Sequence, residues 1–191
     1  TCLVDGGSVS EKYIGEYRIV PYLKYSGVSE LDYVFLTHLD EDHISGVREL
    51  IEMQDSLDGI RIDTIFYPEI ANPDEKYMEM WELSKEKGIH VEKIGAGDRL
   101  KGDDYDIACL HPIKGSSSTD KNDSSIVLQV NFRNFSMLLS GDMGFDGEKE
   151  LLKRGVLTNI DVWKVSHHGS KYSGGETFLH VIDPELSLIS V

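Results

Sequence analysis

The chain lacks long hydrophobic runs and is poor in basic residues relative to acidic ones. No stretch reaches the about 20 consecutive apolar residues that a membrane-spanning helix needs, so the sequence predicts no such helix. The 19 Lys and Arg residues stand against 34 Asp and Glu, which gives a formal net charge of -15 at pH 7. Because neutralising nucleic-acid phosphates requires Lys and Arg, this balance argues against a broad nucleic-acid-binding face.

Cysteine is also scarce. The two that are present, Cys2 and Cys109, do not have the paired spacing of a zinc knuckle, which excludes that kind of site. Each lies in an apolar run that is typical of a strand, so we expect two buried thiols rather than a disulfide. Neither falls in a polar cluster, and we therefore expect no cysteine ligand to a metal.

The chain is long enough to build a sizeable hydrophobic core, and no repeat or low-complexity tract interrupts it. We therefore expect a single domain over residues 1–191. The sequence begins at Thr1 and ends at Val191 within strand-like runs, which leads us to expect a fragment of a longer protein, truncated at both ends. Predicted strands and helices alternate, with hairpins among them, and this pattern is typical of mixed sheets layered with helices.

Hydrophobic periodicity and turn residues predict the elements. Residues 114–124 are polar and rich in serine, which predicts a loop. We expect a hairpin at Arg133-Asn134. Strands are predicted over residues 1–4, 31–36, 62–67, 89–94, 105–110, 125–132, 135–139, 160–165 and 186–191, and helices from near Pro21 to Gly27 and over 44–53, 73–87, 145–152 and 176–181.

One polar segment, Thr37-His38-Leu39-Asp40-Glu41-Asp42-His43, lies between the apolar run 31–36 and the helical pattern 44–53. A turn between a strand and a helix can hold short side chains so that they converge. Converging imidazoles and carboxylates are ligands for a divalent metal. The alternative is a helix cap at Asp42, but a cap needs one such side chain and this turn carries four.

Further polar residues follow other predicted strands. Asp5 follows residues 1–4, Asp142 follows 135–139, and His167 with His168 follows 160–165. Sites in layered α/β folds gather at the carboxyl ends of strands, so these residues could meet the histidine segment in one cleft. Each carboxylate has an alternative interpretation as a turn residue, Asp5 in Asp-Gly-Gly and Asp142 in Ser-Gly-Asp.

This ordered set, a strand-end Asp, then His-x-Asp-x-Asp-His, then Ser-Gly-Asp after a hairpin, then a strand-end His, resembles the metallo-β-lactamase superfamily. The resemblance runs from Asp5 to His168. Asp40 in place of the commoner second histidine, the run Asn122-Asp123-Ser124-Ser125 and the run from Lys164 to Ser170 resemble the corresponding domain of ComEC-type DNA-uptake (competence) proteins. The resemblance implies an α/β fold, an αββα sandwich of mixed sheets layered with helices.

The resemblance also implies a dinuclear metal site. His38 and Asp40 would bind the first ion, and Asp42 with His43 the second. A carboxylate can bridge two ions about 3.5–4 Å apart, and Asp142 would do so. The complete implied ligand set is His38, Asp40, Asp42, His43, Asp142 and His167.

Other residues would act around these ligands. His167 is favoured over His168 as the ligand because it directly follows the strand, and His168 would face substrate or pack beneath the turn. Asp42 and His168 are the candidate catalytic residues. Asp5 resembles a buried carboxylate that orients the metal segment, and Ser170 with Lys171 could contact a phosphate.

The family's third motif, a histidine before the hairpin, has no counterpart at the expected place. By its spacing from Asp142, that place falls near Asn122 or Asp123, so water or an amide oxygen could complete the first site. His111 lies too far back in the sequence, unless a loop returns it. His111-Pro112 is interpreted as a strand terminator.

The ligand set favours two divalent ions, Zn²⁺ or Mn²⁺, because replacing an imidazole by Asp40 makes the site richer in oxygen. We expect a metal-dependent hydrolase, a phosphodiesterase or nuclease that uses a dinuclear site to activate water. The alternatives are hydrolysis of carboxylic or thiol esters, lactones or β-lactams, and a degenerate metal-binding domain that holds nucleic acid or a partner. The expected partners are a phosphodiester such as single-stranded DNA and a membrane-channel portion of a parent protein, with an extracytoplasmic or membrane-tethered location.

Overall fold

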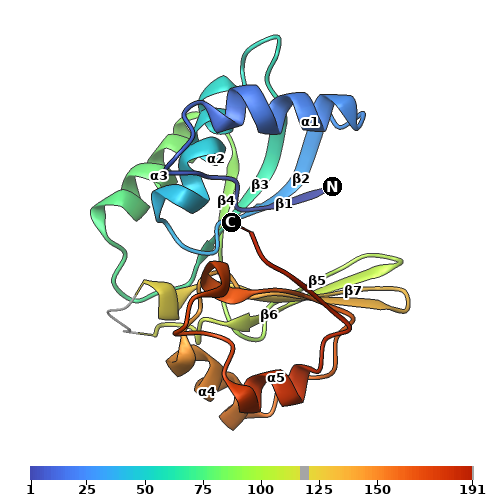
Figure 1. Cartoon of the computed structure of the whole chain (residues 1–191). Helices are drawn as coiled ribbons and strands as arrows, with labels where there is room; N and C mark the ends of the chain where they lie inside the picture. The colour runs from blue at the N-terminus through green and yellow to red at the C-terminus, as the bar shows by residue number, and fades with distance from the viewer. Residues whose placement is uncertain (117–120, 191) are drawn as a thin grey trace. The chain divides into compact units, whose positions relative to one another are not determined.

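The computed structural model describes residues 1–116 and 121–190 (Figure 1). It divides into two compact units, each with its own sheet and helices. The first unit comprises Thr1–Tyr67 and Asn72–Lys93, and the second comprises Pro68–Ala71 and Ile94–Val191. The single domain expected over residues 1–191 stays a prediction.

The sheet of the first unit has the strand order β1-β2-β3-β4. Its strands are β1 (Cys2–Val4), β2 (Glu30–Phe35), β3 (Arg61–Pro68) and β4 (His90–Ile94). β2 runs parallel to both β1 and β3, with Val4 opposite Phe35. Because parallel strands end at the same edge of a sheet, the residues that follow β1 and β2 emerge side by side.

The first unit also contains a short π-helical turn η1 (Gly15–Ile19) and the helices α1 (Val20–Tyr25), α2 (Glu41–Met53) and α3 (Glu75–Glu86). α2 buries the predicted apolar positions Ile44, Val47, Leu50 and Ile51. The helix begins three residues earlier than predicted, so Asp42 lies inside its first turn. The alternative in which Asp42 caps the helix is therefore wrong, since the N-cap position belongs to Asp40.

The sheet of the second unit has the order β10-β9-β8-β7-β6-β5. β8 pairs parallel with β9, and β9 with β10, whereas the neighbours from β5 to β8 pair antiparallel. The parallel β8–β9 pair brings the residues after these two strands to one edge of the sheet. The strands are β5 (Arg99–Lys101), β6 (Tyr105–His111), β7 (Val127–Phe132), β8 (Phe135–Leu139), β9 (Val162–Lys164) and β10 (Leu186–Leu188).

Two helices, α4 (Phe145–Arg154) and α5 (Glu176–Ile182), lie on the same face of this second sheet (Figure 1). They enclose a core that includes Leu151 of α4, Phe178 of α5 and Trp163 of β9. The short turns η2 (Asn122–Ser124) and η3 (Ser166–Gly169) precede β7 and follow β9. The helices therefore fix the sheet edge from which the polar residues after β8 and β9 emerge.

Most predicted elements are present, and the differences have local causes. The prediction missed β5, because its three residues are too few to show an alternating pattern. The predicted loop over 114–124 contains η2, and its residues 117–120 lie outside the described residues. The last predicted strand is shorter, Leu186–Leu188, and Val191 also lies outside the described residues. Within residues 1–116 and 121–190, the helices are all too short or too polar to span a membrane.

The two cysteines differ in exposure. Cys109 is buried in β6 as predicted, but Cys2 is exposed, which corrects the expectation of two buried thiols. The cause is the place of β1 at the edge of its sheet, where β2 is its one neighbour among the strands that the structure describes. Both thiols are free.

We expect an alkylating reagent at pH 8 to modify one thiol per folded chain, at Cys2, and both thiols after denaturation. Burial raises the pKa of the Cys109 thiol to about 12, so almost none of the reactive thiolate forms at that position. Peptide mapping of the labelled chain identifies the modified cysteine. Labelling of Cys109 at the same rate as Cys2 would contradict its burial.

Candidate metal centre

Asp5 organises a polar cluster in the first unit. It follows β1, and its carboxylate receives three hydrogen bonds from residues that follow β2. Oδ1 accepts the Thr37 backbone N–H at 2.8 Å, and Oδ2 accepts the Thr37 hydroxyl and His43 Nδ1, both at 2.7 Å. The parallel pairing of β1 with β2 brings these groups together across 32 to 38 residues of sequence.

These bonds fix how the two buried histidines of the cluster are protonated. An ionised carboxylate only accepts hydrogen bonds, so His43 carries its proton on Nδ1. Thr37 gives its own hydroxyl hydrogen to Asp5, so it accepts at 3.2 Å from His38 Nδ1. A neutral imidazole protonated at Nδ1 has its lone pair on Nε2, which is the arrangement of metal-binding histidines.

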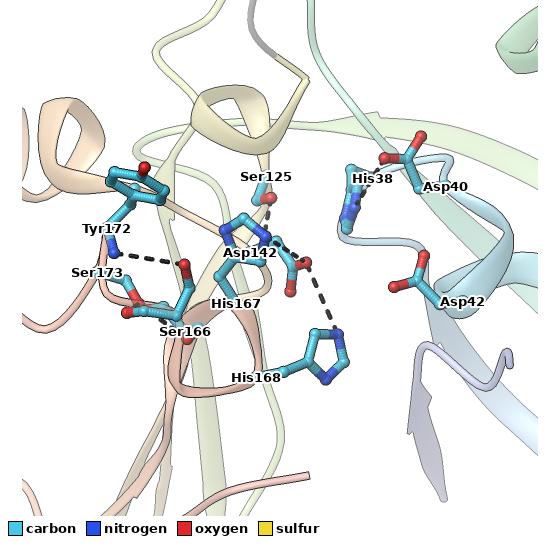
Figure 2. A network of polar contacts seen from close by, with 12 residues as sticks. His38, Asp40, Asp42, Ser125, Asp142, Ser166, His167, His168, Tyr172 and Ser173 are labelled. Atoms are coloured by element: carbon cyan, nitrogen blue, oxygen red, sulfur yellow. Dashed lines mark hydrogen bonds and ion pairs between the residues drawn. The ribbon is translucent and has the colours of Figure 1, made fainter. Parts of the chain in front are cut away.

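Each of these Nε2 atoms lies near a carboxylate of the same segment. His38 Nε2 is 3.8 Å from Asp40 Oδ2, and His43 Nε2 is 3.9 Å from Asp42 Oδ2. Two metal bonds of about 2.1 Å can join atoms up to about 4.2 Å apart, so either pair could bind one ion. The first of these pairs is visible in Figure 2.

Glu41, the remaining acidic residue of the segment, is engaged elsewhere. Lys76 Nζ lies 2.8 Å from its carboxylate and Arg48 Nη2 lies 3.6 Å away. The Lys76 ammonium holds the pKa of the Glu41 carboxyl below its ordinary value. The cations therefore compensate this carboxylate and leave metal binding to its neighbours.

Asp142 is the centre of a second polar cluster, in the second unit. It follows β8 in the turn Ser140-Gly141-Asp142 and is 3% exposed. The segment that precedes β7 supports this turn, because the Asp142 N–H donates to Ser125 Oγ at 3.3 Å and the Gly144 N–H donates to Asp123 Oδ1 at 3.1 Å. The place of the absent third-motif histidine is thus filled by groups that hold the Asp142 turn.

Two histidines of the turn η3 point toward Asp142 (Figure 2). From Asp142 Oδ2, the Nε2 atom of His168 is 3.7 Å away and that of His167 is 4.0 Å away. The Nδ1 atom of His168 lies 3.2 Å from the Ser190 carbonyl oxygen and 3.1 Å from the Ser190 hydroxyl oxygen, and the carbonyl can only accept a hydrogen bond from it. His168 thus has the orienting partner typical of a metal ligand, although His167 remains the predicted one.

Other predicted residues lie around this second cluster. His111 ends β6, as expected of a strand terminator, and its Nδ1 donates to the Ser125 carbonyl at 3.0 Å. Ser170 Oγ accepts from the Tyr172 N–H at 3.3 Å. Lys171 is exposed, with its Nζ 5.0 Å from the centre of the Tyr172 ring. Asn122 lies in η2, at the start of the supporting segment.

Among the described residues, the candidate metal ligands include Asp42 and His43 in the first unit, and Asp142 and His168 in the second. The sequence reasoning did not assign Thr37 or Ser125, whose hydroxyls hold the two clusters. Thr37 begins the segment that ends at His43, and its hydroxyl next to two histidines could have indicated its role. Ser125 could not be distinguished from the other serines of its loop.

Known proteins resemble this chain along most of its length. Residues 1–55 match the model of the metallo-beta-lactamase superfamily. The ComE operon protein 3 of Bacillus subtilis is 35% identical over 93% of this chain and 22% of its own length. The competence protein ComA of Neisseria gonorrhoeae is 30% identical over 98% of this chain and 23% of its own length. Recombination protein 2 of Haemophilus influenzae is 27% identical over 97% of this chain and 20% of its own length.

The fold is also that of solved members of the superfamily. The metallo-beta-lactamase fold protein YhfI from Bacillus subtilis superposes with a TM-score of 0.57 at 14% identity, covering 100% of this chain and 76% of YhfI. A B3 metallo-beta-lactamase with an active-site glutamic acid superposes with a TM-score of 0.52 at 12% identity, covering 93% of this chain and 73% of the lactamase. The chain spans about a fifth of the length of its curated relatives. It is a metallo-β-lactamase superfamily domain, with an α/β fold, related to these competence proteins.

Proposed function

We propose that this domain is a metal-dependent phosphodiesterase or nuclease. The observation that carries the proposal is the set of contacts made by the ring nitrogens of three histidines. In His38, His43 and His168 a protein acceptor lies within hydrogen-bond distance of Nδ1, and Nε2 lies within 3.9 Å of a carboxylate oxygen. A purely structural histidine has no need of this repeated arrangement, whereas a metal ligand does.

The ligand set that the sequence predicts would supply one dinuclear site. His38 and Asp40 would hold one ion, and Asp42 and His43 the other. Asp142 would bridge the two ions, and either His167 or His168 would complete the second. The oxygen-rich donor set suits Mn²⁺ as well as Zn²⁺. The supporting chemistry is the donor set itself, imidazole nitrogens and carboxylate oxygens at spacings that metal bonds can span.

The ions, when bound, would lower the pKa of water and neutralise charge that develops on a phosphoryl group. The protein would orient the reacting groups. Asp5 holds His43 and Thr37 in place through its three hydrogen bonds. Whichever histidine of η3 is not a ligand would face the substrate, where Ser170 and the exposed Lys171 could contact phosphate oxygens.

Two relatives are named for competence or recombination, which favours a nucleic-acid substrate such as single-stranded DNA. With a net charge of -15, this domain would depend on a parent protein for the basic surface that holds a long nucleic acid. We propose a membrane-channel portion of that parent as the partner, with the domain membrane-tethered or extracytoplasmic.

The test is metal analysis followed by a substrate panel. After reconstitution with Zn²⁺ or Mn²⁺, we expect two ions per chain by elemental analysis. The loaded chain should hydrolyse bis(p-nitrophenyl) phosphate and single-stranded DNA, and chelation should remove the activity. Hydrolysis of a lactone or a chromogenic β-lactam instead would favour the ester and lactam alternative. A chain that binds no ion would favour a degenerate domain.

A further inference from the structure

The turn that carries His167 and His168 has an unfavourable backbone. Both residues have left-handed conformations, with φ of 48° and 52°, and Gly169 follows at 76°. For residues with a Cβ such conformations are unfavourable and persist only where surrounding contacts hold them. Something in the second unit must therefore hold this turn.

The loop from Ser166 to Gly175 is bonded at both ends to the segment that contains Asp142. At its start, the His167 N–H donates to the Gly141 carbonyl at 3.1 Å. Near its end, the Tyr172 carbonyl accepts the Phe145 N–H at 3.1 Å. In its middle, the Ser173 hydroxyl lies within hydrogen-bond distance of the Ser166 and Ser170 carbonyls, at 3.0 and 3.1 Å. The loop is thus braced internally and attached around Asp142.

The end of the loop is held by a buried carboxylate. Glu148 of α4 is 2% exposed, and its Oε1 accepts the Gly174 N–H at 2.5 Å while Oε2 accepts the Gly175 N–H at 2.9 Å. Burying a carboxylate is unfavourable unless its oxygens are hydrogen-bonded, and here each oxygen has a backbone donor. Glu148 also lies six residues after Asp142, on the helix that begins at the Asp142 turn.

We propose that Glu148 is a positioning residue, which fixes the histidine turn against Asp142 by binding the N–H groups of Gly174 and Gly175. The proposal rests on the proposed metal site. The Glu148 carboxylate binds the N–H groups of Gly174 and Gly175, so it acts through the backbone of the loop. Without it, the end of the loop loses two bonds, and the left-handed histidines can relax away from Asp142.

The test compares Glu148→Gln with the wild-type chain. Glutamine has nearly the same shape but only one acceptor oxygen, and its amide would face a backbone donor. In the metal-free chain we expect the amides of Gly174 and Gly175 to exchange with solvent about tenfold faster. In calorimetric titrations with Zn²⁺ and with Mn²⁺ at 10 °C, where the fold is intact by circular dichroism, we expect affinity to fall about 10- to 100-fold.

The matched control is Asp146→Asn, which removes an exposed carboxylate from the same helix and should leave both measurements unchanged. If Glu148→Gln does not fold, Gly175→Ala tests the same contact, because its Cβ would lie 3.0 Å from Glu148 Oε2 at an ordinary φ of -58°. Unchanged amide exchange, or faster exchange with unchanged metal affinity, would overturn the proposal. A wild-type chain that binds neither ion would instead overturn the proposed metal site.

Discussion

Asp142→Asn is expected to remove metal-dependent phosphodiester hydrolysis and the stabilisation that a bound metal would give the fold. Losing a bridging ligand should lower activity more than losing a residue that only orients a ligand, which typically costs about 10- to 100-fold. We therefore expect activity to fall about 100-fold or more.

Hydrolysis of bis(p-nitrophenyl) phosphate with Mn²⁺ and the melting temperature with and without metal measure both effects. Metal should raise the Tm of the wild type and not that of the variant, because a ligand stabilises only the fold that binds it. Asp146→Asn, with its carboxylate exposed four residues away, is the control for a general loss of charge. Full activity in Asp142→Asn would remove Asp142 from the site.

Asp5→Asn is expected to weaken metal binding and to destabilise the fold. One amide oxygen cannot accept from the Thr37 N–H, the Thr37 hydroxyl and His43 Nδ1 together, and the amide NH₂ would face donors. We expect unfolding free energy to fall by about 1–3 kcal/mol and metal affinity to fall about 10- to 100-fold. Urea unfolding of the metal-free chain and calorimetric metal titration give the two values.

This variant also separates the two interpretations of Asp5. Its φ of 56° is left-handed, a conformation that asparagine adopts as readily as aspartate. If Asp5 served only to form the turn before Gly6, the variant would match the wild type in both measurements. Asp63→Asn on β3 is the matched control, since that carboxylate is exposed in the same unit.

The predictable parts of the fold are those with a strong local pattern. The apolar spacing from Ile44 to Ile51 predicted α2, and the turn at Arg133-Asn134 predicted the hairpin of β7 and β8. The start of α2 was placed too late because its first turn, with Asp42 and His43, is polar and shows no apolar period. Cys2 was expected to be buried because the apolar sequence of a three-residue edge strand does not differ from that of an interior strand.

The site was predictable where side chains share a short segment and less so where they meet backbone groups. The segment from His38 to His43 contains two histidines and three carboxylates within six residues. The sequence did not indicate a role for Glu148. Its partners are the backbone N–H groups of Gly174 and Gly175, which lie 26 and 27 residues further along the chain, and almost every residue has such a group. His111 was correctly interpreted as a strand end, but its bond to the Ser125 carbonyl needed the fold.

The pairing of β1 with β2 bears on when during folding the metal can bind. Asp5 and His43 are 38 positions apart and meet only through the parallel pairing of these strands. Contacts of this range form late, after the entropy of closing the intervening chain has been overcome. An unfolded chain would offer its histidines in either tautomer and without a common orientation. Metal capture would therefore report completed sheet assembly, and a metal-sensitive dye could time the end of folding.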